Sequence, residues 1–280
     1  MIKRILVALD ADSDTPVAIQ YAADIAQRHA AEITGLALID MVSIGASSVG
    51  GGIGSMYLQE KVRVTLTSEA RDVANRLAAS FREALEQAHV PGHAQVEDGA
   101  PIERIVEDLN YHDLLVIGKV PHFFYSHPEQ ATMTLEEVIG RVVGPTLVAP
   151  EVHRPVQRVL VAYDESPASS RALRRFLNLR PFGTEVAVEI LNVHGKGERS
   201  QSRLALQRAQ AFMRVHGFEA GIVSVQSADP NKEIMEYVER SSTDLLVAGA
   251  HVVSPLVKLT SGSTTASFLQ IVPVPLWLDN

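Results

Sequence analysis

Two stretches of this chain occur twice in nearly the same form. The segment R-I-L-V-A-L-D at residues 4–10 returns as R-V-L-V-A-Y-D at 158–164, and D-L-L-V-I-G at 113–118 returns as D-L-L-V-A-G at 244–249. Repeats separated by more than a hundred residues indicate two copies of one domain rather than a solenoid of short repeats. We therefore expect two domains, at residues 1–150 and 156–280, which are called the first half and the second half below.

The composition narrows the class of protein. A chain of 280 residues suits two domains of about 140 residues, each large enough for an ordinary core. Cysteine is absent, which excludes disulfides and thiolate metal sites and is typical of a reducing cytoplasm. The formal net charge of −8 opposes nonspecific binding to nucleic acid, and no window reaches the roughly 18 apolar residues of a membrane span. We expect a cytoplasmic protein that binds neither nucleic acid nor a membrane.

Both halves alternate apolar runs of strand length with segments of helical period. In the first half, for example, the run at 5–9 precedes apolar residues spaced by three and four along 17–26. Strict alternation with strands that are apolar on both faces predicts an α/β fold, with an open five-stranded parallel sheet and helices on both faces in each half.

Turn and cap signals add local expectations. Thr15-Pro16 and Ser166-Pro167 each predict a helix start, with the hydroxyl at the N-cap and proline in the first turn. The glycine-rich segment from Ser43 to Ser55 is predicted to be a flexible loop or lid.

The two halves differ at the sheet edge where α/β proteins bind ligands, beyond the carboxyl ends of the strands. The second half places there Asp164, His194, Gly249 and then Gly262, Ser263, Thr264 and Thr265. Glycine permits close approach of the backbone, and a helix that begins at Ser263 would present N–H groups and hydroxyls to an anion. An ordinary turn glycine with a serine N-cap would give the same residues.

The first half lacks this Gly-Ser pair. Its equivalent helix is predicted to start at the capping box Thr134-Leu135-Glu136-Glu137, whose two carboxylates would repel a phosphate. We therefore expect a working anion site in the second half and a degenerate one in the first.

At these residues the chain resembles a tandem universal stress protein, with two such domains in one chain. ATP-binding members of that family carry G-x2-G-x9-G-[S/T]. Gly249, Val252, Gly262 and Ser263 keep this spacing, with Val252 in place of the second glycine. If that position needs a positive φ, the valine costs about 1–3 kcal/mol, or roughly one to two decades in affinity.

The resemblance implies a strand order of 3-2-1-4-5 and an adenine nucleotide in the crevice of the second half. The ligand would be ATP, with Mg²⁺ arriving on the nucleotide, or ADP or AMP in its place. Asp164 would then meet the ribose or adenine, Val193 would line the adenine, and the phosphates would lie on Gly249, His251, Gly262, Ser263, Thr264 and Thr265. The resemblance further implies that the halves pair through their fifth strands as an intramolecular pseudo-dimer, and a homodimer is a further option.

The machinery of hydrolysis is missing from the sequence. There is no P-loop motif, no G-x-S-x-G nucleophile elbow and no H-E-x-x-H metal motif. We therefore predict no catalytic residues and no metal site, and a stress-response regulatory protein that binds a nucleotide and a protein partner. The alternatives are a nucleotide-free scaffold that uses the aromatic loop of His122, Phe123, Phe124, Tyr125 and His127, and, least favoured, a nucleotidyl-transfer enzyme.

Overall fold

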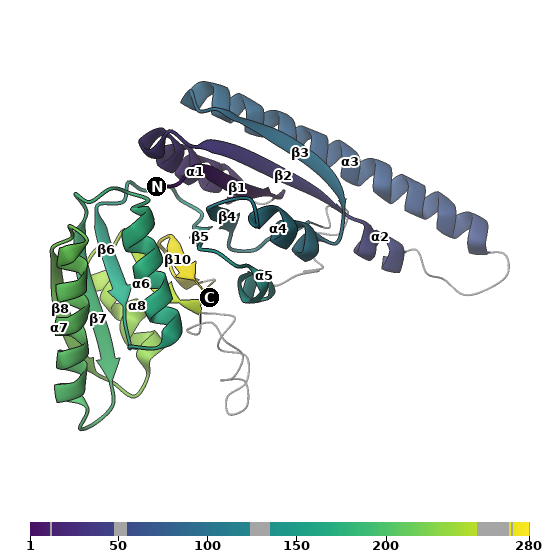
Figure 1. The fold of residues 1–280 in the computed structure, drawn as a ribbon. Coiled ribbons are helices and arrows are strands. Elements are labelled where there is room, and N and C mark those ends of the chain that lie inside the picture. Colours follow the sequence, from purple (N-terminus) through teal and green to yellow (C-terminus); the bar gives the residue numbers. More distant parts are fainter. Residues whose placement is uncertain (12, 48–54, 124–134, 251–268, 270, 280) are drawn as a thin grey trace.

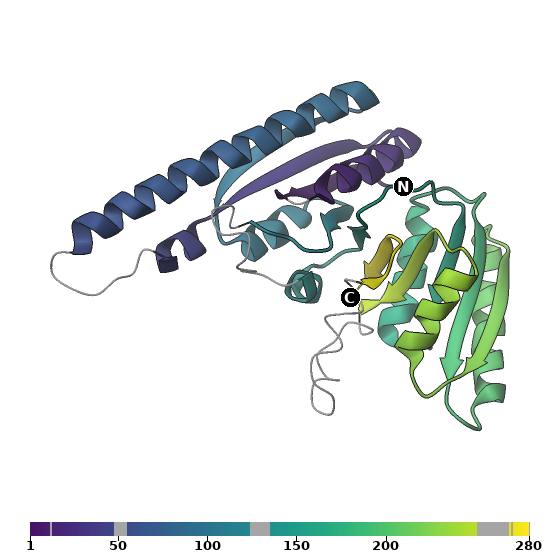
Figure 2. The ribbon, with the colours of Figure 1, turned by 180° about the vertical axis from the view of Figure 1, so that it is seen from behind.

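The computed structural model describes all residues except 12, 48–54, 124–134, 251–268, 270 and 280. Its strands form one ten-stranded sheet in the order β3-β2-β1-β4-β5-β10-β9-β6-β7-β8. The first half supplies β1 to β5 and the second half supplies β6 to β10 (Figure 1; seen from behind in Figure 2).

The first half has the predicted alternation of strands and helices. Its neighbouring strands pair in parallel, which gives the order 3-2-1-4-5 implied by the resemblance. The strands are β1 (Arg4–Leu9), β2 (Glu32–Asp40), β3 (Gly92–Gly99), β4 (Leu114–Gly118) and β5 (Thr146–Ala149). The helices are α1 (Thr15–His29), α2 (Met41–Ser47), α3 (Ser55–Ala88), α4 (Pro101–Leu109) and α5 (Leu135–Arg141).

The second half repeats this arrangement. Its strands follow the same spatial order, and their pairs within the half are again parallel. The strands are β6 (Arg158–Ala162), β7 (Ala187–His194), β8 (Ala220–Gln226), β9 (Leu245–Gly249) and β10 (Leu276–Asp279), and the helices are α6 (Pro167–Leu179), α7 (Arg199–Val215) and α8 (Pro230–Arg240). The helix predicted from Ser263 begins outside the described residues.

The two halves join through their fifth strands. β5 and β10 pair antiparallel, with Leu147 opposite Trp277. The order within each half is as predicted, whereas the sheet is continuous rather than divided into two. An unpaired edge strand would leave its N–H and C=O groups without partners, and this pairing removes one such edge from each half.

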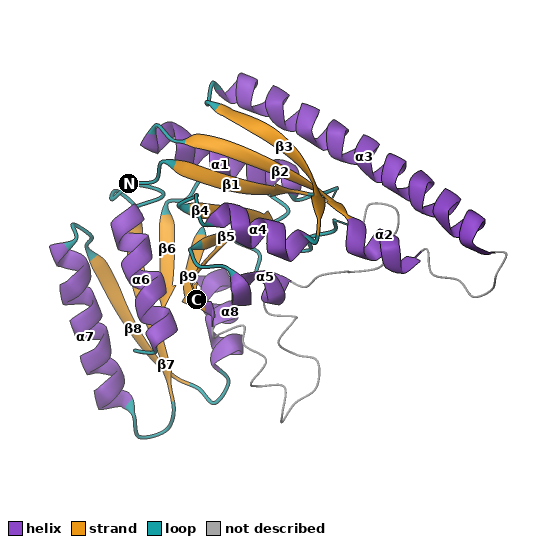
Figure 3. Ribbon diagram, turned by 45° about the vertical axis from the view of Figure 1, so that its right-hand side comes forward, coloured by secondary structure: helices purple, strands orange, loops and turns teal. Residues whose placement is uncertain are grey.

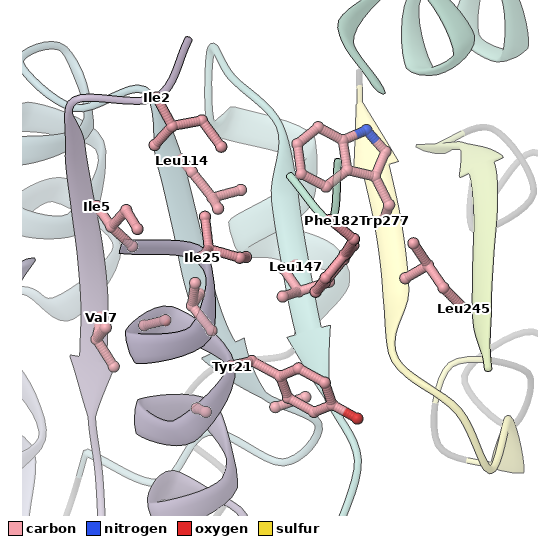
Figure 4. Close-up of a cluster of buried hydrophobic side chains, with 14 of the residues drawn as sticks. Ile2, Ile5, Val7, Tyr21, Ile25, Leu114, Leu147, Phe182, Leu245 and Trp277 are labelled. Atoms are coloured by element: carbon pink, nitrogen blue, oxygen red, sulfur yellow. The ribbon is translucent and has the colours of Figure 1, made fainter. Parts of the chain in front are cut away.

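Helices cover both faces of the sheet, and each face has its own hydrophobic cluster (Figure 3). The cluster under α1, α3, α6 and α7 includes Tyr21, Phe81, Phe176 and Trp277. The cluster under α4, α5 and α8 includes Ile105, Val138 and Ile234. Both clusters contain side chains of both halves, so the core runs across the junction. Figure 4 shows this for Tyr21, Leu147, Phe182 and Trp277.

The connection between the halves is fixed to α1. The hydroxyl of Tyr21 donates to the carbonyl oxygen of Arg154 at 3.1 Å and accepts from its backbone N–H at 3.0 Å. The side chain of Tyr21 is fully buried, and the Phe182 ring of the second half meets it edge-on with centroids 6.5 Å apart.

Two local expectations need correction. The start of the predicted Ser43–Ser55 loop belongs to the helix α2 (Met41–Ser47), because the carboxylate of Asp40 accepts from the backbone N–H groups of Val42 and Ser43 and satisfies the first turn. Ser55 begins α3, and residues 48–54 lie outside the described residues. Thr15 is not an N-cap: α1 begins at Thr15 itself, and its hydroxyl donates to Asp10. The Ser166 cap is confirmed, since its hydroxyl accepts from the N–H of Ser169.

α3 spans 34 residues, or about 51 Å at 1.5 Å per residue, and projects well past the sheet in Figure 1. Among the described residues, no helix is long and apolar enough to cross a membrane.

Candidate functional site

A cavity of about 240 Å³ lies at the carboxyl edge of β6, β7 and β9 in the second half. The first turns of α6 and α8 close its sides, so five elements contribute to its wall. Its lining combines aliphatic and hydrogen-bonding side chains: Ala162, Tyr163, Asp164, Ser166, Ser169, Leu191, Val193, Pro230, Asn231, Ile234 and Gly249.

Asp164 supplies the carboxylate of this cavity. Its Oδ1 accepts from the Ser169 hydroxyl at 2.6 Å and from the Ser166 backbone N–H at 3.0 Å. Partial desolvation raises the pKa of Asp164, but the hydrogen bonds from Ser166 and Ser169 together outweigh it and leave the pKa below its usual value. Both of these hydrogen bonds go to Oδ1, and within the described residues Oδ2 accepts none, so an ionised oxygen is available to a ligand hydroxyl.

Gly249 lets the end of β9 approach α6. A Cβ at this position would lie 2.5 Å from the backbone nitrogen of Ser169 and 2.6 Å from the carbonyl carbon of Ala168. Real side chains do not reach such distances, so a residue larger than glycine would push the strand and the helix apart. Gly249 thereby lets β9 and α6, which both line the cavity, lie close together.

Val193 is half-buried on β7 and lines both this cavity and a second one. The second cavity, of about 300 Å³, lies between the end of β7 and α7 and is lined mainly by polar side chains: Asp164, Glu165, Asn192, Val193, His194, Glu198, Gln201, Ser202 and Ala205. His194 belongs to this second cavity, where its Nδ1 lies 2.8 Å from the carbonyl oxygen of Gly195. Glu165 has a φ of 62°, in the left-handed region, directly after Asp164.

The equivalent edge of the first half is occupied by its own side chains. Asp10, which follows β1 as Asp164 follows β6, is 1% exposed. Its Oδ1 accepts from the Thr15 hydroxyl at 2.5 Å and its Oδ2 from the backbone N–H of His122 at 3.2 Å. Both carboxylate oxygens of this aspartate are therefore used within the chain.

A second carboxylate fills the place beside Gly118, the counterpart of Gly249. A Cβ on Gly118 would meet Asp14 at 2.2–2.6 Å, and Asp14 Oδ2 accepts from the backbone N–H of Lys119 at 2.7 Å. The residue at the same distance from the strand in the second half is Ala168. Asp14 therefore accepts a hydrogen bond from a backbone N–H group, whereas Ala168 has no side-chain acceptor for the equivalent group.

Phe123 and Lys119 complete the difference. Phe123 is fully buried, in the same cluster as Leu38 and Ile105, the counterparts of Val193 and Ile234. Lys119 is buried and its Nζ donates to the carbonyl oxygen of Val272, so it joins the second half rather than a ligand. Desolvation lowers the pKa of this lysine. A cavity of about 220 Å³ does exist in the first half, but it is lined by Asp40, the first turn of α2 and the start of α4, and neither Asp10 nor Gly118 belongs to its lining.

Three of the residues predicted for the site come together around the first cavity, namely Asp164, Val193 and Gly249. His251, Gly262, Ser263, Thr264 and Thr265 lie outside the described residues, as does Val252. The sequence reasoning did not assign Ser166, Ser169, Asn231 and Ile234 to the site. A serine followed by proline marks the start of α6, and an aspartate followed by proline marks the start of α8. This signal could have placed the first turns of both helices at the carboxyl edge of the sheet.

Within the described ranges there is no group of three or more His, Cys, Asp or Glu side chains that would hold a metal ion.

Comparison with known proteins identifies the fold. A family model described as "Universal stress protein family" matches residues 1–148 and again residues 155–279. A universal stress protein from Synechocystis is 25% identical over 284 aligned positions, which cover 98% of each chain. A universal stress protein structure from Archaeoglobus fulgidus covers 99% of this chain and 98% of its own at a TM-score of 0.68 and 17% identity. A universal stress protein solved in complex with cAMP matches 45% of this chain and 97% of its own, at a TM-score of 0.38 and 21% identity.

Proposed function

Because the chain belongs to the universal stress protein family, we propose that it is a cytoplasmic stress-response regulator whose second half binds an adenine nucleotide. The ligand is ATP, with ADP and AMP as the related alternatives, and it is held in the cavity beside Asp164, Val193 and Gly249. Nucleotide occupancy is then read by a protein partner, with little or no hydrolysis.

The observation that carries this proposal is the difference between the two strand edges. In the second half the edge holds a cavity, and Asp164 presents an oxygen that the chain does not engage. In the first half the same positions are taken up by Asp10, Asp14 and Phe123. One chain thus contains an open and a filled version of the same edge.

The dimensions of the cavity favour the nucleoside part of the ligand. Small-molecule pockets usually measure about 300–1,000 Å³, so a volume of about 240 Å³ does not enclose a whole nucleotide. Leu191, Val193 and Ile234 give an apolar wall for a planar base, and Asp164 is placed to accept from a ribose hydroxyl. The Gly262-Ser263 motif, which follows Gly249 in the sequence, is the proposed partner of the phosphates.

The same chemistry argues against turnover. A general base works best with a pKa near the operating pH, whereas hydrogen bonds hold the pKa of Asp164 below its usual value. Asp164 is therefore suited to accept a hydrogen bond and poorly suited to take a proton from water.

The first experiment is to denature purified protein and identify any released nucleotide by mass. The proposal expects an adenine nucleotide that rebinds in a calorimetric titration at one site per chain. Protein that carries no nucleotide and takes up none of ATP, ADP, AMP or cAMP would overturn it.

A pair of matched variants locates the site. Asp164→Asn should weaken the affinity about tenfold, because a charge-assisted hydrogen bond is replaced by a neutral one. Asp10→Asn changes the equivalent aspartate of the first half, so it should lower the melting temperature and leave the affinity within about twofold. If the Asp10 variant alone lost affinity, the nucleotide site would lie in the first half and its assignment to the second half would be wrong.

The scaffold alternative receives no support from the described residues. It needs the aromatic loop of the first half at the surface, yet Phe123 is fully buried. Phe124, Tyr125 and His127 lie outside the described residues.

A further inference from the structure

Two neighbouring helices of the second half carry only positive charge. α6 contains Arg171, Arg174 and Arg175, and α7 contains Arg199, Arg203, Arg208 and Arg214. Neither helix contains an aspartate, a glutamate or a lysine. Seven arginines thus lie on two helices of a chain whose formal net charge is −8.

These arginines share one exposed layer. α6 and α7 cover the same face of the sheet (Figure 1, Figure 3), and all seven arginines are exposed. The two helices are in contact, since the guanidinium of Arg174 lies 5.1 Å from the ring centroid of Phe212 on α7. We call this layer the arginine face.

The first half provides an internal comparison. Its equivalent helices α1 and α3 cover the same side of their own strands. α1 carries one aspartate and one arginine besides His29, and α3 carries five acidic and five basic residues. The fold therefore does not require positive charge on these two helices. Compared with α1 and α3, the excess of positive charge on α6 and α7 belongs to the second half alone.

Acids of the chain lie beside at least three of these arginines. Arg175 lies 3.4 Å from Asp279, Arg214 lies 3.6 Å from Glu219, and Arg208 lies 4.0 Å from Glu165. All three acids come from outside the two helices, and the arginine side chains in these pairs stay more than half exposed. The pairs with Glu165 and Glu219 are exposed on both sides, and such pairs are weak and readily exchanged for a better partner, whereas Asp279 is buried and keeps its hold on Arg175.

We propose that the arginine face docks an aspartate- and glutamate-rich segment of a partner protein. The guanidinium group binds carboxylates through two parallel hydrogen bonds, a geometry that lysine does not offer. α7 itself carries arginines and no acids over about 26 Å, which makes it complementary to such a segment.

The charge of the rest of the chain favours a protein segment over nucleic acid. Removing the seven arginines from the net charge of −8 leaves −15 for the remainder. A nucleic acid continues beyond the arginine face and would run along this acidic remainder, whereas a short acidic segment ends with the face.

The test uses a dye-labelled poly-glutamate peptide long enough to span α7, and follows its fluorescence anisotropy on the full chain. The variant Arg171→Gln/Arg199→Gln/Arg203→Gln keeps good helix formers and removes three charges. Its affinity at low salt should fall about tenfold, and wild-type binding should weaken as salt is raised.

The matched control removes three exposed arginines from α3, as Arg63→Gln/Arg76→Gln/Arg82→Gln. It should bind the peptide within about twofold of wild type, because the same charge is lost outside the arginine face. Three results would overturn the proposal: no peptide binding at low salt, equal losses in the two triple variants, or tighter binding of a DNA duplex of the same length than of the peptide.

Discussion

Asp10 and Asp164 show how one residue type takes two roles at the same place in two related halves. Asp10 is buried, and the Thr15 hydroxyl and the His122 backbone engage both of its oxygens. Asp164 is exposed, and the serines of α6 engage only Oδ1. The first arrangement stabilises the fold, and the second leaves an acceptor for a ligand.

The pKa of Asp164 gives a prediction for the dependence of stability on pH. A carboxylate whose pKa is depressed in the folded state stabilises the protein above its unfolded-state pKa, and that contribution disappears as the pH falls through the folded-state pKa. Asp164→Asn should therefore melt below wild type at neutral pH and approach it in acid. Thermal unfolding of both proteins between about pH 6 and about pH 2 measures this. A constant difference over the whole range would contradict the assignment.

At the residue scale, strand ends and a fixed motif spacing marked Asp164 and Gly249, and the family resemblance added Val193; the three residues line one cavity. It did not identify Ser166 and Ser169 as partners of Asp164, because their first visible role is to start α6. The filling of the first half by Asp14 and Phe123 depends on where a loop brings distant side chains, which residue type and spacing do not specify.

At the scale of elements, the repeated strand and helix order followed directly from hydrophobic periodicity. The exception is α2, since Met41–Ser47 combines glycine and serine with few helix formers. Its first turn is stabilised by Asp40 at the end of β2, a contact between elements rather than a local propensity.

The packing of α3 on β2 offers a prediction at this scale. A Cβ on Gly35 would lie 2.7 Å from the ring of Phe81, so Gly35→Ala should cost about 1–3 kcal/mol of unfolding free energy. Gly45→Ala on α2 is the matched control, because nothing lies within 4 Å of its added Cβ and alanine favours the helix. Denaturant unfolding measures both, and equal effects would show that the close contact is not as described.

On the scale of the whole molecule, the β5–β10 pair turns two domains into one sheet with a shared core. Trp277 is fully buried at this junction, with Leu147 of the first half opposite it and the Phe176 ring 6.0 Å away. The family resemblance implied both the order of the strands in each half and the pairing of the halves through their fifth strands, and the β5–β10 pair confirms that pairing. Local periodicity alone does not specify this junction, because it depends on how two sheet edges meet in space.

A continuous core predicts joint unfolding. The native protein should show indole emission typical of an apolar environment, and its loss on heating should coincide with the loss of far-UV circular dichroism. Two separate steps in the dichroism, with the tryptophan following one of them, would mean that the halves unfold independently.

The halves differ in the carboxylate beside the end of the fourth strand, and a single substitution transfers that carboxylate to the second half. Ala168→Asp places in the second half the carboxylate that Asp14 provides beside Gly118, so it should engage the backbone N–H of Ala250 as Asp14 engages Lys119. The reverse change, Asp14→Ala, leaves Phe123 in place and should not open a second site. Calorimetric titration with ATP is the direct measurement: wild type and Asp14→Ala should bind one nucleotide per chain, and Ala168→Asp should bind at least about tenfold more weakly. Unchanged affinity in Ala168→Asp, or two nucleotides per chain in the wild type, would contradict the claim that one half is open and the other filled.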